Sequence, residues 1–132
     1  MSSFYENEGF VTTHLDLSDK SMHIKWAKLS NDAVIEACCL AQIEQVKNGI
    51  VRMYLDVSDA VGVPTQERQK WFETVLFPAF SEHGLKVAVT ILPSSAITKL
   101  ASKKWVKTSS PFSFDMFEAQ DLEAAKELAA GY

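Results

Sequence analysis

Alternating apolar and polar residues near the start of the chain predict an antiparallel hairpin. From Phe10 to Leu17 the chain alternates, as a half-buried strand requires. One face carries Val11, Thr13, Leu15 and Leu17, and the other carries the polar Thr12, His14 and Asp16. The alternation resumes from Met22 to Trp26, after a turn-forming cluster at 18–21. Two alternating runs that are separated by a short turn are typical of a β-hairpin.

The next segment has apolar residues at helical spacing. Ser30 or Asn31 can cap a helix that spans Ala33 to Val46, and the polar Lys47-Asn48-Gly49 stretch predicts its end. The apolar side of this helix is wide, as expected for a helix packed on a sheet. The polar residues expected on its solvent side are Glu36, Gln42, Glu44, Gln45 and Lys47.

The middle of the chain predicts strand, helix, strand. The apolar run from Ile50 to Val57 predicts a third strand, and the segment from Thr65 to His83 predicts a second helix. Pro78 lies inside that helix, and because proline lacks an N–H we expect a kink or break between Thr74 and Phe77. The nearly continuous apolar run from Leu85 to Leu92 fits a central parallel strand that is covered on both faces.

The last third predicts a short helix from Pro93 to Ala101, a final strand from Phe112 to Phe117 and a closing helix from Asp121 to Ala130. The order is therefore β-β-α-β-α-β-α-β-α, which is typical of an α/β fold. We expect a single domain over residues 1–132 with a mixed sheet of about five strands. That sheet would be antiparallel at its N-terminal hairpin and parallel later.

Composition narrows the function classes. The net charge of −4 argues against a nucleic-acid partner. The chain has no apolar run of the length of a membrane span and no secretory signal pattern at its start, so we expect a cytoplasmic protein. Cys38 and Cys39 are adjacent inside a helical pattern, where a disulfide would be strained. Buried reduced thiols are the expectation.

The residues Leu55-Asp56-Val57-Ser58-Asp59 close the predicted third strand. With the element order, they resemble the STAS domain, the family of bacterial anti-sigma-factor antagonists and of the cytosolic domains of sulfate transporters. More narrowly, the chain resembles the stand-alone bacterial proteins described as STAS/SEC14-like. This resemblance implies a STAS-like fold and a non-catalytic regulatory module that binds a protein partner, without a cofactor. In the antagonists, a Ser or Thr at the start of the following helix is phosphorylated.

The resemblance places the partner surface on loop 58–65 and the start of the following helix, with Ser58, Asp59, Gly62 and Thr65 as its partner-binding or modifiable residues. Thr65 stands at the phosphorylated position, although the family's Asp-Ser-Ser-Gly-like motif is replaced by Val63-Pro64-Thr65-Gln66. Thr65 is also a plain helix N-cap. Asp56 and Asp59 offer oxygen ligands to a metal, but we expect them to order the loop.

An alternative function is the binding of an apolar ligand or a membrane surface. Helix 71–80 is dense in aromatic residues and is loosened by Pro78, so it could open over an apolar cavity or cover a homodimer contact. The aromatic residues of this ligand hypothesis are Trp71, Phe72, Phe77 and Phe80. The basic patch that could contact an anionic membrane surface comprises Lys99, Lys103, Lys104, Trp105 and Lys107. A solvated helix end is the simpler interpretation of this patch.

The chain shows no pattern of an enzyme. His14, His23 and His83 are scattered; the first two would lie close together across the hairpin, where we expect surface histidines. Two imidazoles alone do not make a zinc site, and no nucleophile motif occurs. We therefore expect no catalytic residues and no metal site.

Overall fold

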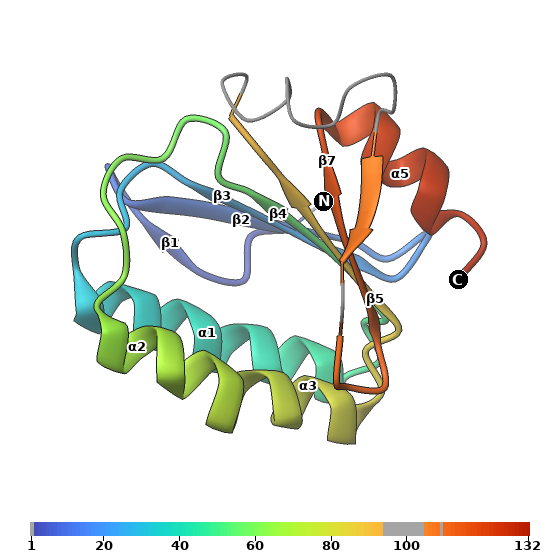
Figure 1. Cartoon of the computed structure of the whole chain (residues 1–132), viewed down its shortest axis with the longest axis horizontal. Helices are drawn as coiled ribbons and strands as arrows, with labels where there is room; N and C mark the ends of the chain where they lie inside the picture. Colours follow the sequence, from blue (N-terminus) through green and yellow to red (C-terminus); the bar gives the residue numbers. More distant parts are fainter. Residues whose placement is uncertain (1, 94–104, 109) are drawn as a thin grey trace.

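A mixed β-sheet with helices on both faces forms the molecule (Figure 1). The computed structural model describes residues 2–93, 105–108 and 110–132. The strands are β1 Glu6–Asn7, β2 Val11–Asp16, β3 Ser21–Trp26, β4 Arg52–Asp56, β5 Val87–Ile91, β6 Trp105–Thr108 and β7 Asp115–Ala119. The helices are α1 Asp32–Lys47, α2 Gln66–Trp71, η1 Phe72–Leu76, α3 Phe77–His83 and α5 Leu122–Ala129.

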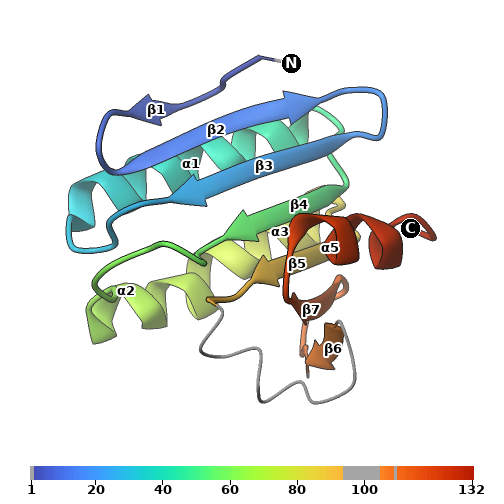
Figure 2. The same ribbon diagram turned by 90° about the horizontal axis from the view of Figure 1, so that it is seen from above.

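The strand order is β1-β2-β3-β4-β5-β7-β6, which can be followed across Figure 2. The pairs β1–β2, β2–β3 and β6–β7 are antiparallel, and β3, β4, β5 and β7 are parallel neighbours. The α/β class and the mixed sheet with an N-terminal antiparallel hairpin are therefore confirmed. The predicted count of about five strands is wrong, because the sheet has seven strands in the part of the chain that the structure describes.

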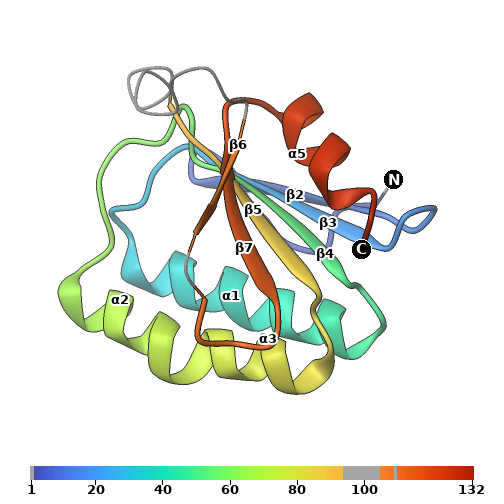
Figure 3. The ribbon, with the colours of Figure 1, turned by 45° about the vertical axis from the view of Figure 1, so that its right-hand side comes forward.

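The helices form two unequal layers. Helix α1 and the continuous α2–η1–α3 segment cover one face of the sheet, and α5 lies on the other (Figure 3). The thick side buries large side chains such as Met22, Ile24 and Phe80. The α5 side packs the small Ala124 and Ala125 against the middle of the sheet. The run around β5 is buried on both faces, as the sequence predicted.

Two short edge strands and one shifted strand account for the differences from the predicted order. Strands β1 and β6 were not predicted. The final strand begins at Asp115 rather than Phe112, because its parallel register with β5 pairs Val87 with Asp115. Phe112 and Phe114 precede β7 and pack against Phe77 of α3, with ring centroids 5.6 and 6.2 Å away. The short helix expected from Pro93 to Ala101 falls, beyond Pro93, outside the described residues.

The helix with Pro78 is irregular where the sequence predicts it. The segment η1 is a π-helical turn, in which the backbone N–H of Phe77 donates to the carbonyl of Phe72, five residues earlier. The Thr74 hydroxyl donates to the carbonyl of Lys70 at 2.9 Å. A wider turn just before a proline accommodates the missing backbone donor without ending the helix.

Both cysteines are buried and free, as predicted. Burial raises the pKa of the Cys38 thiol to about 11 and that of the Cys39 thiol to about 12. Because the thiolate is the reactive form, these thiols act as small apolar side chains of α1.

Candidate functional site

An apolar cavity of about 160 Å³ lies between the sheet and the α1/α2–η1–α3 layer. Met53 and Leu55 of β4 form its floor, and Ile35, Cys39 and Gln42 of α1 form one wall. An engineered cavity of roughly 150 Å³ with similar walls stays dry and binds benzene. A cavity of this size therefore fits a molecule of about one ring.

The cover of the cavity is the irregular helix. The side chains that line the cavity from this helix are Phe72, Leu76, Phe77 and Phe80. Three of the four aromatic residues that the sequence assigned to a ligand site therefore lie at the cavity. Trp71 does not line the cavity. Its ring instead lies under the Arg68 guanidinium, and its centroid is 4.5 Å from the Arg68 Cζ.

The cavity extends to the carboxyl ends of two parallel strands. Trp26 ends β3, Val57 follows β4, and the loop residues Leu29 and Pro64 complete the lining there. Ligands of open α/β sheets bind just outside the carboxyl ends of the strands. The cavity thus reaches the same edge of the sheet as loop 58–65.

Gln42 is a polar side chain that the sequence placed wrongly. It was expected on the solvent side of α1, but it is 3% exposed and lines the cavity. A signal was present, because Ile35, Cys39 and Gln42 follow the i, i+4, i+7 spacing of one helix face. The prediction assigned Gln42 to solvent because it is polar, although its spacing places it on the face of Ile35 and Cys39.

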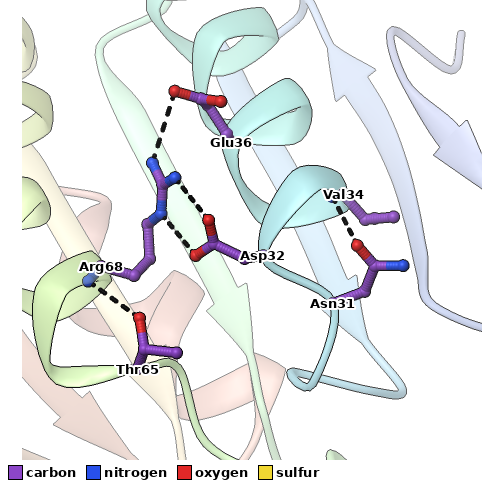
Figure 4. A network of polar contacts seen from close by, with 6 residues as sticks. All are labelled: Asn31, Asp32, Val34, Glu36, Thr65 and Arg68. Carbon is purple, nitrogen blue, oxygen red and sulfur yellow. Dashed lines mark hydrogen bonds and ion pairs between the residues drawn. The ribbon is translucent and has the colours of Figure 1, made fainter.

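An ion-pair clasp, defined here as Arg68 with Asp32 and Glu36, joins the starts of α2 and α1 (Figure 4). The Arg68 guanidinium donates to both Asp32 carboxylate oxygens at 2.8 Å and lies 3.6 Å from Glu36 Oε1. The hydrogen bonds from Arg68 lower the pKa of Asp32. None of the residues of α2, all of which the structure describes, is buried, so the clasp is a principal tie of α2 to α1.

Each of the two helices in the clasp begins at a capping side chain. Asn31 Oδ1 accepts from the Val34 N–H at 3.2 Å, and Thr65 Oγ1 accepts from the Arg68 N–H at 3.1 Å (Figure 4). Thr65 is exposed. The residue predicted as modifiable therefore caps α2 and is also open to solvent.

Loop 58–65 is held at its start and near its middle. Asp56 Oδ1 accepts from the Ser58 N–H at 2.9 Å and from its hydroxyl at 2.6 Å, so Asp56 orders the loop as expected. Asp59 is exposed and lies 3.6 Å from Lys25 Nζ. Farther on, Val61 exchanges backbone hydrogen bonds of 2.9 and 3.0 Å with the segment after β3.

The exposed part of this loop is apolar. Val61 is 58% and Val63 is 77% exposed, on either side of the exposed Gly62. The sequence prediction selected Gly62 and Thr65 here but missed the two valines. Two exposed β-branched residues on an anchored loop give it a fixed apolar surface, which isolated exposed residues do not.

The opposite face of the sheet carries a histidine pair. His14 and His23 face each other across β2 and β3, with ring centroids 4.3 Å apart. Their closeness was predicted, but the expectation of surface histidines is wrong for His23, which is 7% exposed. Among the described residues, no three His, Cys, Asp or Glu side chains gather as a metal site would require.

Most of the predicted basic patch cannot be placed. Lys99, Lys103 and Lys104 lie outside the described residues, and only the backbone of Trp105 is described, in β6. Lys107 is exposed, 3.6 Å from Asp115 Oδ1. Within the described part of the chain, no helix has the length and apolar character needed to cross a bilayer.

Comparison with known proteins found no match to any protein-family model, to any curated protein or to any solved structure. The STAS resemblance therefore stays a prediction from the sequence, and proposals about function rest on the geometry of this chain.

Proposed function

We propose that this protein binds a small, mainly apolar molecule in the cavity beneath the α2–η1–α3 segment. The observation that carries the proposal is the cavity itself, about 160 Å³ between mainly apolar walls. An empty cavity forfeits van der Waals contacts on its inner surface, and a fitting occupant restores them. No catalytic step is part of this proposal.

The cover of the cavity supports the proposal. The π-turn η1 lies directly over it and contributes Phe72 and Leu76 to its lining. Single π-turns inside α-helices occur frequently at functional sites. A helix with a weak point at the cavity can admit a ligand with less disruption than a regular helix could.

The test uses benzene as the probe and a cavity-filling variant. Benzene at ten times its dissociation constant should raise the free energy of unfolding of the wild type by about 1.4 kcal/mol. Replacing Val57 by phenylalanine (Val57→Phe) places a ring at the cavity lining and should abolish this increase. Thermal unfolding with and without benzene measures the effect, and chemical-shift changes locate it.

The matched control is Val51→Phe, the same substitution just before the opposite end of β4 and away from the cavity. It should respond to benzene like the wild type. A wild type without any benzene response would contradict the proposal, as would an equal response of Val57→Phe.

We propose as a second candidate that loop 58–65 binds a protein partner, as the STAS resemblance implies. The specific observation is the anchored apolar surface at Val61 and Val63. Phosphorylation of Thr65 would add close to two negative charges beside this surface. The charge would also compete with Asp32 for Arg68, which couples the loop to the ion-pair clasp.

Charged substitutions on this loop test the second candidate. Val63→Asp and Thr65→Glu should each weaken partner capture at least tenfold. The introduced carboxylate would lose its hydration at the centre of the interface without gaining a partner, which costs binding free energy. Leu17→Asp is the control, since Leu17 is exposed on the β2–β3 turn. Quantitative pull-down with the three variants measures the effect, and capture that all three leave unchanged would contradict this candidate.

A further inference from the structure

We infer that the cavity selects a neutral ligand of about one ring that carries a hydroxyl or ring N–H group, which the Gln42 carboxamide recognises. This inference rests on the proposed function, because it specifies the ligand of the same cavity. It names Gln42 as the residue that determines specificity. A phenol is the simplest member of this ligand class.

The first support is the burial of a strongly polar side chain without adequate partners. Gln42 is 3% exposed. Within the described part of the chain, its carboxamide makes one hydrogen bond, from Nε2 to the Cys38 Sγ at 3.5 Å. A sulfur atom is a weak acceptor, so most of the hydrogen-bonding capacity of this amide is unused.

The second support is the position of Gln42 in the wall. The neighbouring α1 residues at the cavity are Ile35 and Cys39, and Met53 of the sheet is also part of its lining. A buried polar group without partners lowers stability, and a leucine would fill this position without that cost. A ligand group that pairs with the amide would remove the cost.

The chemistry of the wall defines the ligand further. Among the described residues that line the cavity, none carries a charge. An ionised ligand would lose its hydration without compensation and is disfavoured. The Gln42 Nε2 already donates to Cys38 Sγ, so the acceptor Oε1 is the atom left for the ligand. Its best complement is a neutral group that donates, such as a hydroxyl, on an otherwise apolar body.

The test compares phenol with benzene on the wild type and on Gln42→Leu. The leucine should weaken phenol binding about tenfold and change benzene binding by less than about twofold, because one hydrogen bond is lost while the apolar contacts remain. Gln45→Leu is the matched control on the same helix, away from the cavity, and should change neither affinity. Ligand-detected NMR titration gives both dissociation constants.

Two outcomes separate this inference from the proposed function. If Gln42→Leu weakens phenol and benzene binding equally, or neither, while benzene binds the wild type, the inference about Gln42 is overturned and the proposed function stands. If neither probe binds the wild type, the proposed function itself fails. Gln42→Met repeats the test with an unbranched side chain if the leucine variant does not fold.

Discussion

Replacing Phe80 by alanine should lower the free energy of unfolding by about 4 kcal/mol, the central value for a fully buried phenylalanine. Phe80 is 0% exposed in α3, and its ring centroid lies 6.5 Å from that of Phe77 and 6.3 Å from that of Phe114. Two contributions make up this loss of stability. One is the favourable free energy of moving the ring out of water, and the other is the cost of the cavity that its removal leaves. Urea unfolding of the two proteins measures the difference.

The same substitution bears on the cavity, because Phe80 is part of its lining. The vacated space joins the cavity, so benzene should restore part of the lost stability. Phe112→Ala serves as the control, since Phe112 is half-buried and lies away from the cavity; its loss should be smaller, and benzene should not offset it. A Phe80→Ala loss below about 2 kcal/mol would mean that Phe80 contributes less to the core than its burial indicates.

Acid should destabilise the protein through His23 between about pH 6.5 and pH 4. Burial, followed by the nearby charge of His14, lowers the pKa of His23 to about 4. In the unfolded chain the same imidazole binds a proton near pH 6.5. The unfolded state therefore binds more protons in this interval, and stability that is complete above pH 6.5 declines as the pH falls toward 4.

The free energy of unfolding should fall by about 2 kcal/mol through His23. This is less than the full difference between its folded and unfolded pKa values gives, because the site relaxes when the ring is protonated. Two hydrogen bonds identify the tautomer of the neutral ring. The Ser21 hydroxyl donates to Asp19 Oδ1 at 2.6 Å, so its 3.1 Å contact with His23 Nε2 needs the ring proton on Nε2.

Urea unfolding at pH 7.0 and pH 4.5 measures this dependence. His23→Gln should remove most of the difference between the two pH values, because glutamine does not titrate. His14→Gln should keep most of it, since burial is the largest cause of the lowered pKa. An unchanged pH dependence in His23→Gln would assign the acid sensitivity to other groups.

Strands with long periodic patterns could be predicted from the sequence, and short edge strands could not. The β2–β3 hairpin shows clear alternation and β5 is a buried apolar run. Strand β1 has two residues and β6 has four, which is too few to show a period. They exist because neighbouring strands offer backbone partners, and that information lies elsewhere in the chain.

The candidate site was predictable in its location more than in its residues. The aromatic segment around Pro78 indicated a weak helix above an apolar space, and the strand ending at Asp56 indicated the edge of the sheet to which the cavity extends. Gln42 was missed because polarity alone assigned it to solvent. Trp71 was misplaced because its partner, Arg68, is tied to Asp32, a residue far away in sequence.

The π-turn also fixes the phase of the long helix. Each residue added to or removed from an α-helix rotates everything beyond it by about 100°. On one side of η1, Arg68 is oriented toward Asp32, and on the other Phe80 is oriented into the core. With one residue fewer between them, one of these two orientations would be lost, so the length of this helix is as constrained as its composition.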